Sequence, residues 1–353
     1  MEHTYGVIMA GGKGERFWPL STKRVPKPFI RLLATNTMIQ MTVERLLKIV
    51  PEDRIMVVLG AEHLAIAQEQ LSLWPAVRYL VEPAGRDTAP CIGLAAVTLQ
   101  REDPKALMVV VPSDHYIPDQ FIFVETMRKG IRLARDDARL VTTGIKPTRP
   151  ETGYGYIQAG KRLPSDVPDG CFEVRRFVEK PDARRAADYL AEGGYYWNSG
   201  IFIWQADTVL RGIARHMPRL DRGLQQIRAA MDAGDEVKKD EFFCALEKRS
   251  IDYGLMEKAE NVVMLEAGFI WDDVGTWSSL QRVLPADERG NCIHGEAVCV
   301  DTKGCVIYGE DVPVGTIGLE NLIVVASKRG VLVCPKDRDQ DARKIAGHME
   351  NDD

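Results

Sequence analysis

The stretch YGVIMAGGKGERFWPLSTKRVPKPF, residues 5–29, carries the densest structural signal in this chain. It opens with an apolar run, residues 5–10, that is typical of a buried β-strand, and three closely spaced glycines follow at once. A glycine turn directly after a first strand lets backbone N–H groups approach phosphate oxygens. A tight turn that binds nothing has the same composition, so the glycines alone leave both interpretations open.

Two common glycine motifs do not fit this turn. The dinucleotide-binding motif needs glycines at positions i, i+2 and i+5, and counting from Gly12 the third position is Phe17. A P-loop needs a Gly-Lys pair followed by Ser or Thr, whereas Gly12-Lys13 is followed by Gly14. Both of these classes of nucleotide-binding protein are therefore excluded.

Two cationic residues after the glycines point to a ligand. Arg16 carries a planar guanidinium that can bind two phosphate oxygens, while Lys27 is a movable point charge. Pro26 and Pro28 stiffen the backbone around Lys27. This arrangement suits a triphosphate better than a single phosphate.

Beyond the turn, apolar runs alternate with helix-like stretches. The strand-like runs are residues 54–59, 77–81, 106–111 and 139–145, and the helix-like stretches are 37–49, 61–72, 89–101 and 121–136. This alternation predicts an α/β fold with a Rossmann-like, mostly parallel (mixed) sheet flanked by helices. The fully apolar run 106–111 is expected at the sheet centre, and ligands are expected beyond the carboxyl ends of the strands.

The second half of the chain has a different pattern. Strand-like runs 153–159, 172–178 and 197–204 alternate with helical stretches 183–192, 206–216, 219–233 and 252–259, which predicts an insertion that extends the sheet. Short β runs separated by Gly and Asp turns follow a linker at 285–291. Two domains are expected: residues 1–285, and a small β-rich C-terminal domain, residues 286–353, that ends in a charged tail.

Bulk composition excludes several partners. Lys and Arg number 46 against 51 Asp and Glu, a net charge of −5, so the basic excess of a nucleic-acid-binding protein is missing. No apolar run approaches the ~20 residues that span a bilayer, and the N-terminus lacks the basic region of a signal peptide. Seven cysteines without a CxxC pair suit a reducing compartment. A cytoplasmic protein without membrane or nucleic-acid partners is expected.

The glycine turn and its cations resemble the signature of the sugar-1-phosphate nucleotidyltransferases. The pair Phe17-Trp18 before Pro19-Leu20 resembles the mannose-1-phosphate guanylyltransferase branch of that family. Other segments that resemble the family follow in family order up to residue 277. They are residues 82–90, 112–115, 152–157, 177–181, 197–202, 251–258 and 268–277.

This resemblance implies an enzyme that transfers GMP from GTP to α-D-mannose 1-phosphate, giving GDP-mannose and pyrophosphate. The sugar phosphate would attack the α-phosphorus in line, assisted by Mg²⁺ or another divalent cation such as Mn²⁺. The nearest alternative is the same chemistry with another sugar 1-phosphate (heptose or glucose) or another nucleoside triphosphate. A non-catalytic nucleotide-sugar sensor would be expected to lose Asp114, Asp273 or Lys180, and all three are present.

Two further expectations come from family members. Relatives are often dimers, so a homodimer formed through the β-rich domain is left open. Longer relatives append a phosphomannose isomerase domain, and the sequence ends before one would fit. A single activity, without isomerase activity, is therefore expected.

The resemblance also implies which residues bind the nucleotide. The loop is expected to hold the phosphates, and the segment from Glu82 is expected to surround guanine and ribose. The nucleotide-binding set is Ala10, Gly11, Gly12, Gly14, Glu82, Gly85, Arg86, Thr88 and Ser113. Asp87 stands where relatives have Asn, which puts a base contact by that residue in doubt. From the residues alone, this segment also fits an ordinary turn with Thr88 as a helix cap.

The metal and the catalytic charges are assigned in the same way. Asp114 and Asp273 are implied as the ligands of one Mg²⁺, which prefers one or two carboxylates plus substrate phosphates. Both acids also fit a capping role, and Asp272 is expected to act only indirectly. The implied catalytic residues are Arg16, Lys27 and Lys180. His115 beside Asp114 is expected to be structural.

A sugar pocket completes the implied site. Glu179 and Asn198 are implied to bind sugar hydroxyls, Gly155 to let backbone lie against the sugar, and Lys180 to bind the sugar phosphate. Neighbouring residues of a strand point to opposite faces, so Glu179 and Lys180 are not expected to pair with each other.

Overall fold

The computed structural model describes residues 2–12, 14–136, 138–164 and 168–349. A mixed β-sheet forms the centre of its fold. Across these residues the sheet has nine strands. In spatial order they are β3 (Arg78–Glu82), β2 (Ile55–Gly60), β1 (Thr4–Met9), β4 (Leu107–Pro112), β8 (Tyr195–Gln205), β5 (Leu140–Ile145), β9 (Val262–Glu266), β7 (Cys171–Val178) and β6 (Tyr156–Arg162).

Parallel pairing prevails in the first half of the sheet. Strands β3, β2, β1 and β4 pair parallel with one another. Strand β8 runs antiparallel to both β4 and β5. Strand β5 pairs parallel with β9, and β7 runs antiparallel to β9 and β6. The expected mixed sheet, extended by the second half of the chain, is confirmed.

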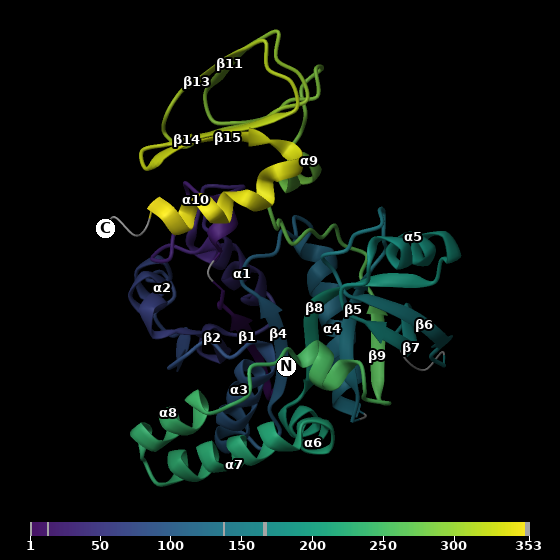
Figure 1. Cartoon of the computed structure of the whole chain (residues 1–353). Helices are drawn as coiled ribbons and strands as arrows, with labels where there is room; N and C mark the ends of the chain where they lie inside the picture. Colours follow the sequence, from purple (N-terminus) through teal and green to yellow (C-terminus); the bar gives the residue numbers. More distant parts are fainter. Residues whose placement is uncertain (1, 13, 137, 165–167, 350–353) are drawn as a thin grey trace.

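Helices cover both faces of this sheet (Figure 1). Alternate side chains of β1 enter separate cores, since Ile8 packs in one apolar cluster and Val7 in the other. The first cluster includes residues of α1 (Met38–Leu46), α2 (Leu64–Gln70) and α4 (Gln120–Asp136). The second includes residues of α3 (Thr88–Glu102), α6 (Ala206–His216), α7 (Pro218–Asp232) and α8 (Glu236–Cys244). None of the helices described is both long and apolar enough to cross a membrane.

Short parallel strands form the C-terminal β region. Strands β10 (Cys292–His294), β12 (Val306–Gly309) and β14 (Leu322–Ser327) pair parallel, and so do β11 (Ala297–Val300) and β13 (Val314–Ile317). Because alternate strands pair in parallel, the chain winds rather than folding back in hairpins. Strand β15 (Gly330–Pro335) then pairs antiparallel with β14, and helix α10 (Ala342–Met349) ends the described chain.

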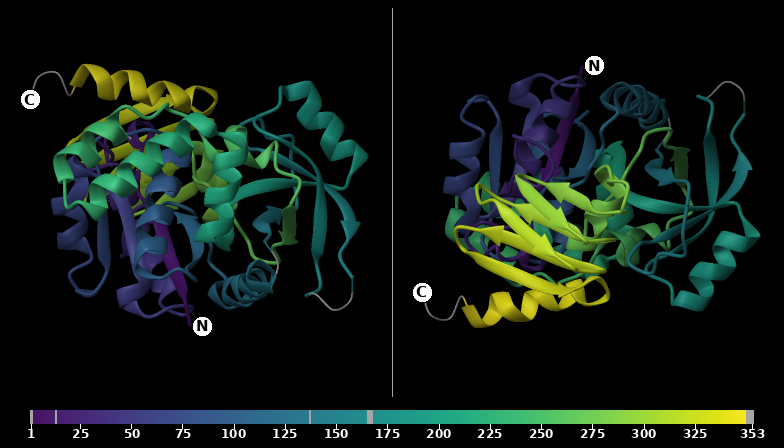
Figure 2. Two further views of the ribbon diagram at one scale, coloured as in Figure 1. Left: turned by 90° about the horizontal axis from the view of Figure 1, so that it is seen from below. Right: turned by 90° about the horizontal axis from the view of Figure 1, so that it is seen from above.

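The C-terminal strands lie over the purple N-terminal part of the chain, with α10 along their edge (Figure 2). Phe17 and Trp18 share a buried apolar cluster there with Trp277, Tyr308 and α10. The Trp277 indole N–H donates to the carbonyl of Trp18 at 3.1 Å, and the ring centroids of Trp277 and Phe17 lie 5.1 Å apart. The aromatic pair after the glycines therefore fastens the loop to the C-terminal region.

Several elements differ from the sequence prediction. Helix α8 and strands β9 and β10 were not predicted, and the helix expected over 252–259 is a single π-helical turn, Asp252–Met256. The segment 276–284 is a 3-10 turn, Trp277–Ser279, followed by the short helix α9 (Leu280–Val283), with Thr276 capping as expected.

Candidate active site

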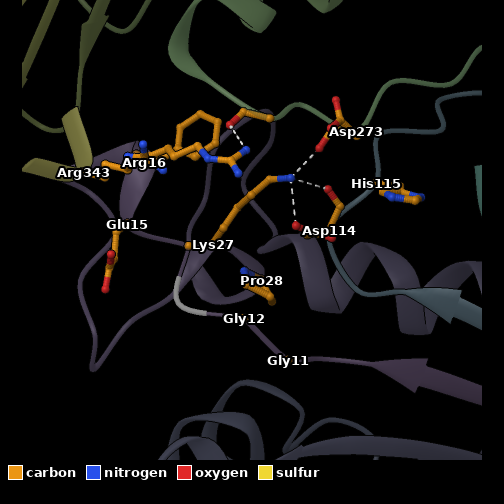
Figure 3. Close-up of a pocket in the computed structure, with 13 residues that line it drawn as sticks. Gly11, Gly12, Glu15, Arg16, Lys27, Pro28, Asp114, His115, Asp273 and Arg343 are labelled. Atoms are coloured by element: carbon orange, nitrogen blue, oxygen red, sulfur yellow. Dashed lines mark hydrogen bonds and ion pairs between the residues drawn. The ribbon is translucent and has the colours of Figure 1, made fainter. Parts of the chain in front are cut away.

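A cavity of about 420 Å³ opens at the carboxyl ends of β1 and β4 (Figure 3). The glycine turn follows β1 and Asp114 follows β4, and these two strands are hydrogen-bonded neighbours. The cavity is lined by Gly11, Gly12, Gly14, Glu15, Arg16, Phe17, Lys27, Pro28, Asp114, His115, Asp273, Gly275 and Arg343. The structure thus brings together the predicted phosphate loop, both predicted metal ligands and two predicted catalytic cations.

Two glycines in the turn have conformations that explain their presence. Gly12 has φ 106°, in the region that favours glycine. Gly14 has φ 58°, and a Cβ there would lie 2.4 Å from the backbone nitrogen of Lys27. The turn therefore closes directly onto the segment that carries Lys27.

Lys27 lies at the centre of the site. Its ammonium donates to the carboxylate and the carbonyl of Asp114, each at 2.9 Å, and to the carbonyl of Asp273 at 2.5 Å. The lysine side chain is only 7% exposed. The buried Lys27 ammonium therefore links three segments by hydrogen bonds: the glycine loop, the end of β4 and the loop after β9.

The two predicted metal ligands differ in electrostatic environment. Burial opposes ionisation of Asp114, but the Lys27 ammonium outweighs it and the pKa of Asp114 lies below its ordinary value. Burial raises the pKa of Asp273, although Lys27 and the Tyr154 hydroxyl favour its ionised form. Tyr154 donates to Asp273 Oδ1 at 2.6 Å.

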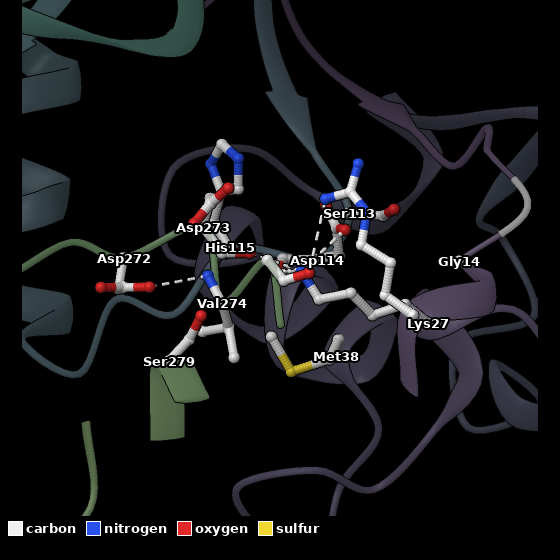
Figure 4. A network of polar contacts seen from close by, with 12 residues as sticks. Gly14, Lys27, Met38, Ser113, Asp114, His115, Asp272, Asp273, Val274 and Ser279 are labelled. Atoms are coloured by element: carbon white, nitrogen blue, oxygen red, sulfur yellow. Dashed lines mark hydrogen bonds and ion pairs between the residues drawn. The ribbon is translucent and has the colours of Figure 1, made fainter. Parts of the chain in front are cut away.

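Asp272 holds the turn that presents Asp273. Its carboxylate accepts from the Arg282 guanidinium at 2.6 and 2.8 Å. It also accepts from the Val274 amide at 2.8 Å (Figure 4). Val274 has φ 45°, which is costly for a β-branched residue. Asp272 therefore holds a strained backbone beside Asp273, and its expected indirect part in metal binding stays a prediction.

His115 belongs to the same framework. The Trp271 indole N–H donates to His115 Nδ1 at 3.1 Å, and burial lowers the pKa of His115 to about 4. The ring is therefore neutral, which fits its expected structural role.

Two residues of the predicted nucleotide-binding set, Ala10 and Ser113, directly follow β1 and β4. The amide of Ala10 already donates to the Val58 carbonyl at 2.8 Å, so it is not free to bind phosphate. Ser113 is buried, and its carbonyl accepts from the Thr42 hydroxyl at 3.1 Å.

The predicted base-binding segment lies at the carboxyl end of β3 and does not line the central cavity. Glu82 is buried there, its pKa is raised to about 7 by burial, and Oε1 has no partner among the described residues. The guanidinium of Arg86 donates to the carbonyl of Cys244. A Cβ on Gly85 would meet no atom within 4 Å.

The capping residue of α3 is Asp87 rather than Thr88. Asp87 has φ 70°, and its carboxylate accepts from the Thr88 amide at 2.7 Å. Thr88 is the first helical residue, and its hydroxyl accepts from the Ile251 amide at 2.9 Å. An Asn side-chain oxygen could make the same contact to Thr88 as Asp87 does.

The predicted sugar-binding residues also converge. The amide of Asn198 donates to the carbonyl of Gly155 at 2.8 Å, and a Cβ on Gly155 would lie 2.4 Å from Glu179 Oε2. The Asn198 side chain accepts from the Thr142 hydroxyl at 3.1 Å and donates to Asp252 at 2.9 Å. Asn198 is thereby held in one orientation.

The expectation that Glu179 and Lys180 do not pair is wrong. Their side chains form an ion pair at 2.8 Å. Strand β7 ends at Val178, and Lys180 has φ 45°, so the alternation of side chains along a strand no longer applies. Burial opposes the charge on Lys180, but Glu179 outweighs it and raises the pKa of the lysine.

Sequence reasoning missed the roles of four residues: Tyr154, Asp252, Arg282 and Arg343. Tyr154 and Asp252 lie inside segments that resemble the family, so a signal existed for them. Arg282 and Arg343 carry no local motif, and only the fold brings them to the site.

The site consists of a glycine turn with cations that faces two carboxylates. This arrangement suits nucleotidyl transfer. Residues 5–290 match the model of the nucleotidyl transferase family, and residues 295–349 match that of the MannoseP isomerase/GMP-like beta-helix domain. The chain belongs to the nucleotidyl transferase family and is an enzyme of that class. The second match accounts for the parallel winding of the C-terminal strands.

Comparison with individual proteins shows which branch of the nucleotidyl transferase family the chain resembles. The chain is 41% identical to a mannose-1-phosphate guanylyltransferase of Klebsiella pneumoniae, over 98% of this chain and 73% of the relative. Identity to a mannose-1-phosphate guanylyltransferase of Escherichia coli is 40%, with the same coverage. A crystal structure from Thermus thermophilus, described as a mannose-1-phosphate geranyltransferase, matches with a TM-score of 0.89, 36% identity and 99% coverage of both chains. The family expected from the glycine loop is confirmed.

Proposed function

We propose that this chain transfers GMP from GTP to α-D-mannose 1-phosphate and releases GDP-mannose and pyrophosphate. The observation that carries the proposal is the contact of Lys27 with both Asp114 and Asp273 beside the glycine turn. The relatives named mannose-1-phosphate guanylyltransferase, at 41% and 40% identity, support this choice of substrates.

The triphosphate is assigned to the glycine turn. Cβ atoms added at Gly11 and Gly12 would meet no atom within 4 Å, so backbone there is open to a ligand. Arg16 lines the same cavity, and its one contact with the part of the chain that the structure describes is a weak one, to the Gly275 carbonyl at 3.4 Å. Its guanidinium is therefore available for phosphate oxygens.

A divalent cation, Mg²⁺ or Mn²⁺, is assigned to Asp114 and Asp273. The described residues contain no group of three or more His, Cys, Asp or Glu side chains that could form a cage of protein ligands. A pair of carboxylates that leaves positions for substrate phosphates suits Mg²⁺, which keeps few protein ligands. When bound, the cation supplies charge neutralisation between the two phosphorylated substrates.

Guanine is assigned to the segment that follows β3, with Glu82, Gly85, Arg86 and Thr88 around base and ribose. Glu82 Oε1 is buried and lacks a partner among the described residues, which is costly unless a ligand donates to it. Guanine offers N–H donors on its Watson–Crick edge, so it would satisfy this oxygen.

The sugar is assigned to Gly155, Glu179 and Asn198, with Lys180 on the sugar phosphate. Lys180 is 57% exposed, and its ammonium can turn from Glu179 toward an incoming phosphate. The side-chain oxygen of Asn198 already accepts from Thr142 and Gly200, and its nitrogen donates to Asp252, so the second proton on that nitrogen is the group left for a sugar hydroxyl.

Alignment is then the main task of these residues. The nucleophile is an anionic oxygen of the sugar phosphate, so no strong general base is required. A new P–O bond forms at the α-phosphorus as the bond to pyrophosphate breaks. Arg16 and Lys180 neutralise charge on the two substrates directly, while Lys27 contributes its positive charge from its position between Asp114 and Asp273.

A substrate panel tests this proposal. The wild-type enzyme would be assayed for pyrophosphate release with GTP, UTP, dTTP or ATP, each paired with mannose, glucose or heptose 1-phosphate. We expect the highest kcat/KM for GTP with mannose 1-phosphate. A higher kcat/KM for another pair would replace the proposed substrates. Binding of the substrates without release of pyrophosphate would indicate a nucleotide-sugar sensor.

The proposal also includes the domain boundary, the location and the oligomeric state of the protein. We propose that the boundary lies between residues 285 and 286 and that the protein is cytoplasmic. A homodimer would use the β-rich domain, where Val298, Val300 and Ile317 are exposed. Light scattering of the wild type against a variant with Asp at Val298 would test the dimer.

A further inference from the structure

The cations of the central cavity are not equally available to a ligand. Lys27 donates to three protein oxygens, as many as an ammonium has protons to give. Arg16 donates to the Gly275 carbonyl at 3.4 Å, its single contact among the described residues. Arg343, on α10, lines the same cavity, and within the described residues it has no hydrogen bond or ion pair. Among the described residues, Arg343 is therefore a cation without a protein partner in a cavity that also contains glycine backbone, other cations and three acids.

The neighbours of Arg343 on the chain do have partners. Arg338 and Lys344 both pair with Asp341, at 2.7 and 2.6 Å. These pairs form outside the cavity, because only Arg343 of this group lines it. Of these three cations, Arg343 is the one that lines the cavity and has no hydrogen-bond or ion-pair partner within residues 2–12, 14–136, 138–164 and 168–349.

Packing fixes α10 in this position. Ala342 and Ala346 are buried in the apolar cluster that contains Phe17 and Trp18. Just before the helix, Asp339 accepts from the amide of Ser278 at 3.1 Å and from its hydroxyl at 2.5 Å. The backbone of Arg343 is therefore anchored both to the glycine loop and to the loop that carries Asp273.

Arg16 and Arg343 lie apart from the two predicted metal ligands, Asp114 and Asp273, within the same cavity. Figure 3 shows Arg16, Arg343 and the carboxylate of Glu15 toward one side, and Asp114 and Asp273 toward the other, with the ammonium of Lys27 turned to these two acids. A triphosphate on the glycine turn with its reacting phosphorus beside the acids would extend its far end toward the two arginines. Two planar guanidiniums on one side suit the terminal phosphates, since each can donate two parallel hydrogen bonds.

We propose that Arg343 binds the β- and γ-phosphates of the nucleotide, the part that leaves as pyrophosphate, so that the C-terminal helix completes the active site. This inference rests on the proposed function for its choice of ligand. It assigns the β-rich region and its final helix a direct part in substrate binding, beyond their role in anchoring the glycine loop.

Inorganic pyrophosphate is the probe that tests this assignment, because it contains the leaving group alone. Binding of pyrophosphate, with Mg²⁺ present, would be measured by calorimetry for wild type, Arg343→Gln and Arg343→Lys. Loss of one charge-assisted contact predicts affinity about 10- to 100-fold weaker in Arg343→Gln, with partial recovery in Arg343→Lys. Lys344→Gln, on the same helix but paired with Asp341, is the matched control and should bind like wild type.

Steady-state kinetics supply the second readout. The KM for GTP should rise in Arg343→Gln by a similar factor, while the KM for mannose 1-phosphate and the melting temperature stay at wild-type values. Unchanged pyrophosphate affinity in Arg343→Gln, or an equal loss in Lys344→Gln, would overturn the assignment. If GTP and mannose 1-phosphate are not turned over but pyrophosphate binding still depends on Arg343, the proposed substrates fail and the phosphate site stands.

Discussion

The ammonium of Lys27 lies 2.9 Å from both the carboxylate and the carbonyl oxygen of Asp114. A buried lysine in this position does two things at once. It lowers the pKa of the carboxyl that is proposed to bind the cation, and it keeps the end of β4 against the glycine loop. The charge of the site is therefore arranged before any substrate enters.

Replacing this lysine should remove most of the activity. For Lys27→Met we expect kcat to fall by about 10²- to 10³-fold, the range seen when one preorganised donor is removed. Pyrophosphate release would be compared with that of Lys48→Met, which removes an exposed lysine. Activity of Lys27→Met equal to that of Lys48→Met would exclude Lys27 from the catalytic set.

The Asp272–Arg282 pair should matter for both stability and rate. Arg282→Gln leaves a buried carboxylate without its cation, so we expect a loss of about 1–3 kcal/mol in the free energy of unfolding and a lower kcat. Urea denaturation would measure the first and pyrophosphate release the second. Arg289→Gln breaks an exposed pair with Asp301 and should change neither. An Arg282 variant with wild-type kcat would show that the strained turn at Val274 does not need this support.

Asp252 should tune sugar binding. Asp252→Asn disturbs the hydrogen bond that orients Asn198, so we expect the KM for mannose 1-phosphate to rise about 5- to 10-fold with the KM for GTP unchanged. Burial, and then repulsion from Glu179, raises the pKa of Asp252 to about 7. In the wild type the KM for the sugar phosphate should therefore rise as pH falls through about 7, since a protonated Asp252 accepts more weakly. The variant should lose that inflection, and a retained inflection would assign it to another group.

The buried Glu82 side chain should lower the free energy of unfolding at neutral pH. Burial raises its pKa from 4.5 to about 7, so the folded state holds the proton more tightly than the unfolded state. Its contribution to stability therefore falls as pH rises from about 4.5 to 7. Glu82→Gln should melt a few degrees higher than wild type at about pH 8, with the gap closing toward about pH 4. Thermal melts across this range would show it, and a gap that widens in acid would contradict the sign.

Much of the framework could be predicted from short-range pattern. The apolar runs that became β1, β2, β3, β4 and β5 stand between clear helical stretches, so their type and order follow from periodicity. Because ligands gather at carboxyl ends of strands, the glycine turn and Asp114 were expected at one edge of the sheet, and they line one cavity.

What could not be predicted depends on where elements end and on contacts far apart in sequence. The Glu179–Lys180 pair exists because β7 stops at Val178 and the next turn bends back, which no alternation rule reveals. The parallel winding of the C-terminal strands depends on pairing between non-adjacent segments. Arg343 reaches the cavity only because α10 packs on Phe17, near the opposite end of the sequence.

The most direct test of the central claim is pyrophosphate release from GTP and mannose 1-phosphate, in the presence of Mg²⁺, by wild type and Asp273→Ala. The account predicts that the wild type forms GDP-mannose and pyrophosphate in equal amounts. It also predicts that Asp273→Ala stays folded, with turnover lower by about 10²- to 10³-fold. No GDP-mannose from the wild type, or near-normal turnover by Asp273→Ala, would contradict it.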